Sequence, residues 1–537
     1  MPGPPPGPEA PPDPQHSHVL VIDLGSGGPK AAVVDDTGRV VSHAVERVAT
    51  HLLAGGGAEQ DPADWWLQAR SAARKALAAS GLAPEKILAV SCTSQWSVVV
   101  PVDEHGEPLA RAVHWLDGRG APYNRAITRG FPSVQGYGLG KLLAWIRYTG
   151  LAPTHSGVDS LGHVLFLKNE RPDIYARTHK FLEPMDYLTF RLTGRLTASQ
   201  HTMMPFMLVD NRRWSVLEYS PRLLRLAGLT AEKFPKLVPN DGEVGPVSPE
   251  AARELGLAPA TRVFSGINDT TASALGAGAV RDFDGIVYIG TSAVLTCHIP
   301  FKKTDILHMM ASMPSPIRDK YLLIAEQGTG GKNLEHYLRS VVYAEDAFGT
   351  GTVPADIFDR TNDAAASVGP GSDGVLFLPW LNGSLTPQED AWVRGAFFNL
   401  SLKSTRSHMT RAVMEGVAYN NRWAMGPAER FVGRRFSHLR FAGGGARSDL
   451  WAQIHADVLG VPIHRVVDPV HTTLRGAGLY AFYKLGVRRV DELPGLVGTD
   501  RVFEPREENR AVYDRMYAQF RALFNRTRKV FRALNRS

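Results

Sequence analysis

The sequence predicts an α/β protein made of two similar lobes, and three observations support this prediction. A chain of 537 residues is too long for one compact core. Each half opens with two short apolar strands joined by a glycine-containing turn, at 18–24 and 31–35 in the first half and at 285–290 and 293–298 in the second. Helical and strand patterns then alternate in both halves. We therefore expect a duplicated α/β domain with a boundary near residue 265 and ligands in the cleft between the lobes.

Further elements follow from capping signals and periodicity. In the first half Asp61 is suited to cap a helix and Pro62 to occupy its first turn. The segments expected there are a strand at 39–43, a helix at 62–79 and a strand at 87–92. The segments expected in the second half are a strand at 375–379, a helix at 408–423, a strand at 438–441, a glycine turn at 443–445 and a helix at 449–459.

The charge balance, the cysteine content and the hydropathy of the chain limit the classes of protein to which it can belong. The chain has 60 basic and 53 acidic residues, a net charge of +7, which suits anionic small molecules and does not indicate nucleic acid. Cys92 and Cys297 have no metal-ligand spacing and read as buried, reduced thiols of a cytoplasmic protein. No apolar stretch of about 20 residues predicts a membrane span. These features are typical of a globular, cytoplasmic protein.

The two ends of the chain differ in character. Residues 1–16 are rich in proline, lack the apolar region of a signal peptide and are expected to be a disordered tail. Residues 511–537 are expected to form a basic amphipathic helix, because 519–537 carry six basic and no acidic residues. Its apolar positions are Phe520, Leu523, Phe524, Phe531 and Leu534. We expect the helix to dock on the protein itself, with contact to an anionic membrane surface as the alternative.

Three glycine turns are candidates for holding phosphate or nucleotide. The first is "DLGSGGPK", 23–30, in which glycine backbone N–H groups and a lysine could face an anion. The others are "IGTSAV", 289–294, and "FAGGGARSDLW", 441–451. Each could also be an ordinary hairpin or helix start, and no P-loop motif occurs. Three such turns in two similar halves favour a nucleotide-binding protein.

Asp269 is the single charged residue of "VFSGINDTTASALGAGAV", 263–280. Because a strand ends at Phe264 and a helix begins near Thr270, the simplest interpretation makes Asp269 the N-cap of that helix. The alternative is a functional carboxylate whose small, uncharged neighbours leave it accessible.

The order of motifs resembles the FGGY family of carbohydrate kinases, and within it most closely the xylulokinases. The segments that carry the resemblance are "DLGSGGPK", "EQDPADWW", "HWLDGRG", "FLEPMDYLTFRLTG", "SGINDTTASALGAG", "IGTS", "RGAFFNLSL" and "AGGGARSDLWAQI". They run in this order over about residues 18–520. The resemblance implies two duplicated actin-like (ribonuclease H-like) lobes, 17–265 and 266–510, with an interlobe active-site cleft. It also implies ATP and Mg²⁺ as cofactors and a ketose or polyol as the substrate, a pentulose such as D-xylulose being favoured.

The resemblance also implies roles for individual residues. Asp23 would hold Mg²⁺, and Asp269 would be the general base that deprotonates the sugar hydroxyl. The β- and γ-phosphates would be held by Gly25, Ser26, Gly27 and Lys30, and by Gly290, Thr291 and Ser292 in a second turn. Adenosine would be framed by Gly331, Gly445 and Ser448. The sugar would be held by Gln95, Trp96, Trp115 and Asp117 together with Asp269.

Several alternatives remain open from the residues themselves. Trp115 could be core, and Asp117 could pair with Arg119 to stabilise a turn. The sequence departs from the family pattern at Trp96-Ser97, at 382–387 (including 384–385), at His471 and at Arg475, which affects the choice of sugar and the strength of catalysis. The functional alternative is therefore a sugar- or nucleotide-binding sensor without turnover. A homodimer is among the expected assemblies.

Overall fold

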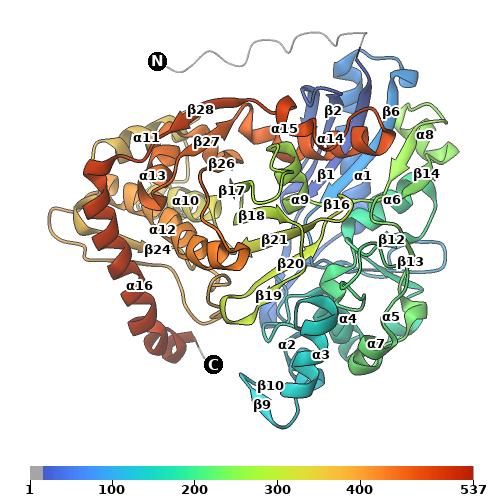
Figure 1. The fold of residues 1–537 in the computed structure, drawn as a ribbon, viewed down its shortest axis with the longest axis horizontal. Coiled ribbons are helices and arrows are strands. Elements are labelled where there is room, and N and C mark those ends of the chain that lie inside the picture. The colour runs from blue at the N-terminus through green and yellow to red at the C-terminus, as the bar shows by residue number, and fades with distance from the viewer. Residues whose placement is uncertain (1–15, 536–537) are drawn as a thin grey trace.

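The computed structural model describes residues 16–535, in which two central sheets lie side by side with helices between and around them (Figure 1). The proline-rich tail predicted for 1–16 falls outside these residues except for His16, as do the last two residues of the predicted C-terminal helix. None of the helices within 16–535 is long and apolar enough to cross a membrane.

The first sheet has the strand order β14-β15-β6-β1-β2-β3, with β16 beside β6. Its strands are β1 (His18–Gly25), β2 (Gly28–Asp35), β3 (Val40–Val45), β6 (Ile87–Ser94), β14 (Glu243–Pro246), β15 (Arg262–Phe264) and β16 (Ile267–Asn268). Strand β1 is antiparallel to β2 and parallel to β6. Gly25 pairs with Gly28, so Ser26 and Gly27 alone form the turn between β1 and β2.

The second sheet repeats this arrangement. Strand β17 is antiparallel to β18 and parallel to β26, just as β1 relates to β2 and β6. Its strands are β19 (Thr304–Asp305), β20 (Met310–Pro314), β21 (Tyr321–Glu326), β18 (Ala293–Ile299), β17 (Gly285–Ile289), β26 (Leu439–Ala442), β27 (Ile463–Val466) and β28 (Thr499–Phe503), in that spatial order. The prediction of two duplicated α/β lobes is confirmed.

Two helices occupy the junction of the sheets. Helix α9 (Asp269–Gly276) contacts β6 and β18, and helix α14 (Thr472–Leu485) packs on β1, β2 and β6, although it comes from the second half of the chain. The two helices cross at glycines. A Cβ atom on Gly276 would lie 1.8 Å from the Thr472 carbonyl oxygen, and one on Gly476 would lie 1.7 Å from that of Ala272. The lobes are thus joined through a backbone-to-backbone contact that side chains would prevent.

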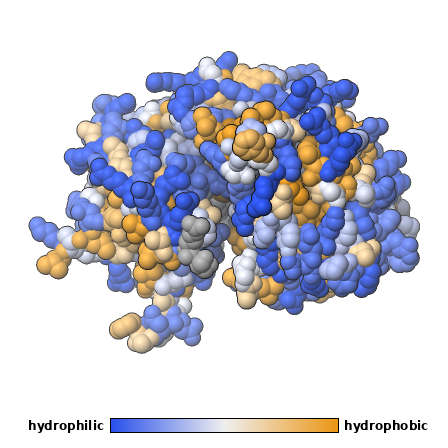
Figure 2. Space-filling view, turned by 90° about the horizontal axis from the view of Figure 1, so that it is seen from below, coloured by the Kyte–Doolittle hydropathy of each residue, from blue (hydrophilic) through white to orange (hydrophobic). Residues whose placement is uncertain are grey.

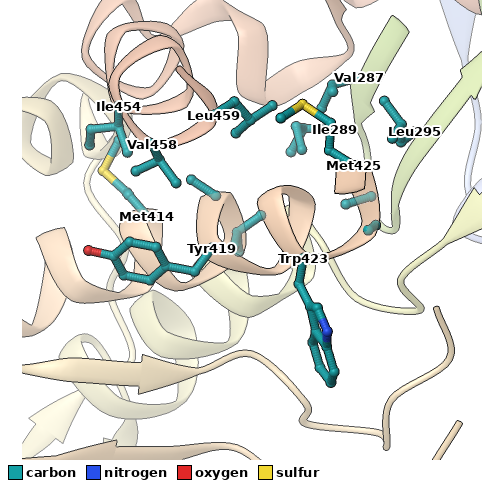
Figure 3. Close-up of a cluster of buried hydrophobic side chains, with 14 of the residues drawn as sticks. Val287, Ile289, Leu295, Met414, Tyr419, Trp423, Met425, Ile454, Val458 and Leu459 are labelled. Atoms are coloured by element: carbon teal, nitrogen blue, oxygen red, sulfur yellow. The ribbon is translucent and has the colours of Figure 1, made fainter. Parts of the chain in front are cut away.

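Helices on the outer faces complete the two lobes. Helix α1 (Pro62–Ser80) covers the first sheet, and Asp61 caps it by accepting a hydrogen bond from the Ala63 N–H group at 2.9 Å. In the second lobe, α12 (Arg406–Val432) and α13 (Asp449–Leu459) pack together over β17 and β18 (Figure 3). The other helices of eight or more residues are α2 (Ala121–Thr128), α3 (Leu139–Thr149), α4 (Ser160–Glu170), α6 (Pro184–Thr193) and α11 (Ile357–Ala366), besides α16 below.

Two predicted elements of the second half differ in the structure. The strand expected at 375–379 is β24 (Leu376–Leu378), which pairs with β25 (Ala396–Phe398) outside the main sheet. The helix expected at 408–423 extends to Val432 as α12 and passes through Pro427. Its buried residues continue to Val432, so packing maintains the helix beyond the proline despite the hydrogen bond that proline removes.

Helix α16 (Glu507–Asn535) contains the predicted basic C-terminal segment and docks on the second lobe, along its outer edge in Figure 1. Phe520 and Phe524 are buried against the aromatic rings of Trp380 and Trp423. An ion pair of 2.7 Å joins Arg528 to Asp390. Docking on the protein itself is therefore the interpretation that the structure supports.

Candidate active site

Asp269 is the first residue of α9, one position after the N-cap. The cap is Asn268, whose side-chain oxygen accepts a hydrogen bond from the Thr271 N–H group at 3.0 Å. The expectation that Asp269 caps the helix is therefore wrong. Because Asn268 performs that role, the Asp269 carboxylate is not needed to hold the helix terminus.

The environment of Asp269 favours its protonated form. Burial raises its pKa to about 7, and repulsion from Asp23 and Glu326 adds to the effect. A weak hydrogen bond of 3.4 Å from the Thr270 hydroxyl acts in the opposite direction. A carboxylate with a pKa near neutrality can accept a proton efficiently at physiological pH.

Asp23 and Lys30 face one another on β1 and β2, where they are cross-strand partners. The Lys30 Nζ atom lies 3.8 Å from the Asp23 Oδ2 atom. The other carboxylate oxygen, Oδ1, is buried and has no hydrogen-bond partner, and burial raises the pKa of Asp23. An unpartnered buried carboxylate oxygen beside a glycine turn that is expected to hold phosphate suits a Mg²⁺ ion, which takes one or two carboxylates and completes its shell with water and phosphate. No cluster of three or more His, Cys, Asp or Glu residues able to hold a metal occurs in 16–535.

The Gly25–Gly28 turn rests on a buried polar network. The Ser26 hydroxyl donates to the Gln95 side-chain oxygen at 2.7 Å and accepts from the Trp115 indole N–H at 2.9 Å. Gln95 in turn donates to Gln60 at 2.9 Å and lies 3.0 Å from His114 Nε2. Gln95 is only 3% exposed. The structure thus places Gln95, and the indole N–H group of the half-buried Trp115, beneath the turn.

Asp117 is fully buried and pairs with Arg119. Its Oδ2 atom lies 2.6 Å from Arg119 Nη2 and also accepts from the Ala58 N–H group at 2.9 Å. Its Oδ1 atom accepts from the Arg119 backbone N–H at 2.9 Å. Both oxygens are therefore used within the protein, and the structure favours the turn-stabilising ion pair over the sugar contact implied by the resemblance.

Trp96 remains half-buried, and its indole N–H donates to the Thr202 carbonyl at 3.1 Å. Its ring lies 5.6 Å from the ring of His201. His201 Nδ1 is 2.9 Å from the Pro314 carbonyl, and the Asn268 N–H group donates to its Nε2 at 3.3 Å. Burial lowers the pKa of His201 to about 4, so this neutral ring links Trp96 to the start of α9.

The second turn borders a cavity of about 480 Å³ in the second lobe. Of the residues expected around the nucleotide, this cavity is lined by Gly290, Thr291, Gly331, Gly445 and Ser448. Ser292 does not line the cavity, and its carbonyl accepts from the Gly290 N–H group at 3.0 Å. A volume of this size is typical of small-molecule sites.

The glycines around this cavity allow backbone segments to approach one another. A Cβ atom on Gly331 would lie 2.5 Å from the Gly290 carbonyl oxygen, and one on Gly445 would lie 2.6 Å from the Ile289 side chain. Ser448 caps α13 by accepting from the Trp451 N–H group at 3.0 Å. Its hydroxyl also donates to the Asn362 side-chain oxygen at 2.6 Å.

Three polar residues near Asp269 and Lys30 were not predicted from the sequence. Tyr288, at the end of β17, accepts a hydrogen bond of 3.4 Å from the Thr473 hydroxyl and acts electrostatically on Lys30. Glu326, the last residue of β21, keeps part of its surface exposed, but the protein around its carboxyl group raises the pKa of that group, and it acts on Asp269. His201 is the third. Tyr288 could have been found because it directly precedes the predicted second turn, whereas no local pattern marks Glu326 or His201.

The duplicated lobes, the paired glycine turns and the carboxylates at their junction define an ATP-dependent phosphotransferase of the actin-like fold. Residues 18–276 match the N-terminal domain, and 286–485 the C-terminal domain, of the FGGY family of carbohydrate kinases. The chain belongs to this family and is a sugar kinase that uses ATP and Mg²⁺.

Three relatives illustrate the similarity. The xylulose kinase of Staphylococcus epidermidis (strain RP62A) is 27% identical over 95% of this chain and 97% of its own length. The gluconokinase of Bacillus subtilis (strain 168) is 25% identical over 93% of each chain. The crystal structure of xylulose kinase from Rhodospirillum rubrum superposes with a TM-score of 0.77 at 25% identity, covering 96% of this chain and 99% of that one.

Proposed function

We propose that the chain transfers the γ-phosphate of ATP to a hydroxyl group of a neutral ketose, a pentulose such as D-xylulose. The observation that carries the proposal is the state of Asp269. Its carboxylate has a pKa of about 7, is relieved of helix capping by Asn268 and lies near Asp23 and Lys30, where the lobes meet.

In this proposal Asp269 is the general base. It accepts the proton of the sugar hydroxyl as that oxygen bonds to the γ-phosphorus, and the bond between the phosphorus and the bridging oxygen of ADP breaks. Lys30 and the N–H groups of the Gly25–Gly28 turn neutralise charge on the phosphates. Mg²⁺, when bound beside Asp23, supplies further positive charge to the phosphate oxygens.

The 480 Å³ cavity is the proposed adenosine site. It adjoins Gly290 and Thr291, so a nucleotide bound there would point its phosphates along the second turn. Ser448 and Asn362, already hydrogen-bonded to one another, offer polar atoms at the cavity wall. Sugar contacts remain proposed for Trp96, whereas Gln95, Trp115 and Asp117 are proposed to support the site from beneath.

Charge at the lobe junction favours a neutral sugar over an aldonate. Asp23, Glu326 and Asp269 interact electrostatically there, and Lys30 is the cation that acts on Asp23. An aldonate would add another negative charge to this group, which costs binding energy unless a further cation compensates. Similarity to xylulose kinases agrees with this argument, while similarity to gluconokinases makes gluconate the substrate to test against it.

The test is a substrate panel with the purified chain, reading ADP formation with Mg-ATP. The panel contains D-xylulose, D-ribulose, D-gluconate, glycerol and xylitol. We expect D-xylulose to give the highest kcat/KM. A higher value for gluconate would refute the neutral-sugar assignment. Thermal stabilisation by sugar and nucleotide without ADP formation would instead support the sensor alternative.

A further inference from the structure

A second cavity, of about 370 Å³, lies on the C-terminal lobe and shares no lining residue with the nucleotide cavity. Its walls come from α12, α16 and two short segments, 307–308 and 387–388. The residues that decide its chemistry are His308, Gln388, Trp423, Arg430, Tyr517 and Arg521. Nothing in the proposed kinase reaction uses them.

The two arginines of this cavity contact a histidine and a tyrosine. Arg430 Nη2 lies 3.5 Å from the Nε2 atom of His308, and Arg521 donates to the Tyr517 hydroxyl at 3.4 Å. The guanidinium of Arg521 also lies 5.0 Å from the centre of the Trp423 ring. Within residues 16–535, neither guanidinium forms an ion pair with a carboxylate.

Two arginines on the same helices that do not line the cavity are paired with carboxylates. Arg422, on α12, pairs with Asp514 at 2.5 Å, and Arg528, on α16, pairs with Asp390 at 2.7 Å. The Nδ1 atom of His308 lies 2.6 Å from Asp305, and its Nε2 atom faces Arg430. Arg430 and Arg521 are exposed and, like Arg526 on α16, have no carboxylate partner within 16–535, but both of them line the cavity whereas Arg526 does not.

The remaining walls suit a small hydroxylated molecule. Tyr517 and Gln388 carry polar groups, while Trp423 contributes ring surface and leaves α12 on the side opposite to Val287 and Ile289 (Figure 3). The face of the molecule seen in Figure 2 is mainly hydrophilic, interrupted by hydrophobic patches. The cavity therefore combines two unpaired guanidinium groups with hydroxyl, amide and aromatic surface.

From these observations we infer that this cavity is a second ligand site, which binds the phosphate group of a small phosphorylated sugar between Arg430 and Arg521. Guanidinium groups bind phosphate through paired, charge-assisted hydrogen bonds. The sugar portion contacts Gln388 and Tyr517. Segment 387–388 directly follows Thr386, whose N–H group donates to the Glu326 carbonyl at 3.0 Å, so the ligand lies beside a segment connected to the catalytic region.

Binding is measured by titration calorimetry with two probes, ribose 5-phosphate and inorganic phosphate. The double variant Arg430→Gln/Arg521→Gln is compared with Arg435→Gln/Arg526→Gln, which removes two exposed arginines that do not line the cavity. Circular dichroism confirms that both variants fold. This comparison isolates the second cavity because the substituted residues lie outside the nucleotide site.

We expect the Arg430/Arg521 variant to lose at least tenfold in affinity while the control variant binds like the wild type. Tighter binding of ribose 5-phosphate than of inorganic phosphate would identify a phosphate ester as the ligand. Equal affinities for the two probes would mean that the cavity binds inorganic phosphate and does not require the sugar portion. The inference is overturned if neither probe binds the wild type, or if the Arg430/Arg521 variant binds both probes unchanged.

Discussion

The substitution Asp269→Asn removes a titratable charge from the proposed base while preserving the size of the side chain. The N-cap of α9 is unaffected because Asn268 supplies it. Loss of a general base at this position should lower kcat by roughly 10²–10⁴-fold. The structure adds a second expectation, that the inactive variant is more stable than the wild type at alkaline pH.

The size of this stability difference follows from the pKa. Burial, aided by Asp23 and Glu326, raises the pKa of Asp269 from 3.8 to about 7 in the folded protein. A shift of about three units at about 1.4 kcal/mol per unit corresponds to an upper value of about 4 kcal/mol. Between pH 4 and 7 the folded state keeps a proton that the unfolded state has lost, so wild-type stability decreases as pH rises through this window.

The Asn side chain does not titrate, so the free energy of unfolding of the variant does not decrease in this way between pH 4 and 7. The free energy of unfolding, measured with urea, should be similar for the two proteins near pH 4. Above pH 7 it should be higher for the variant, by up to about 4 kcal/mol. Activity is measured as ADP formation with Mg-ATP and D-xylulose at pH 8.

A matched control is Asp449→Asn. Asp449 is likewise the first residue of a helix and follows a polar N-cap, Ser448, but it is exposed and pairs with Arg465 and Arg501. Its replacement should leave turnover unchanged and should not stabilise the protein. Near-normal turnover of Asp269→Asn, or a stability difference independent of pH, would refute the assignment of Asp269 as a buried base.

Three other predictions follow from the same region. Glu326→Gln removes a negative charge that raises the pKa of Asp269, so it should move the acidic limb of the pH profile of kcat/KM to lower pH. An unchanged acidic limb would contradict the electrostatic coupling between Glu326 and Asp269. Gly476→Ala forces a Cβ atom against the Ala272 carbonyl and should destabilise the fold by about 1–3 kcal/mol or more in urea, whereas Gly140→Ala, in open space on a helix, should be neutral or slightly stabilising. Asn268→Ala should cost about 1 kcal/mol of unfolding free energy, and no loss would mean that this cap is dispensable.

Much of the fold was predictable because its signals are local. Asp61 and Pro62 mark the start of α1, and the helix predicted at 449–459 has the bounds of α13. The β1–β2 hairpin follows from two apolar runs around glycines. Strand β24 was assigned correctly as a strand, but its partner β25 could not be inferred, because pairing depends on the chain between them.

The site was harder to predict because its chemistry depends on contacts between distant segments. Two neighbouring residues, Asn268 and Asp269, are equally suitable caps, and only the backbone geometry shows which one caps the helix. The resemblance implies sugar contacts for Gln95 and Asp117, yet tertiary contacts bury both of them. Glu326 acts on Asp269 from the end of β21, which is distant in the sequence, so no local sequence pattern predicts this interaction.

The glycine crossing of α9 and α14 has a mechanical consequence for the base. Because the two backbones touch at Gly276 and Gly476, this crossing is the point about which one helix would turn relative to the other. Asp269 lies seven residues from Gly276, a lever arm of about 10 Å at roughly 1.5 Å per residue. A rotation of about 10° at this pivot would therefore carry the carboxylate by about 2 Å, enough to bring it into or out of hydrogen-bonding range of a sugar hydroxyl.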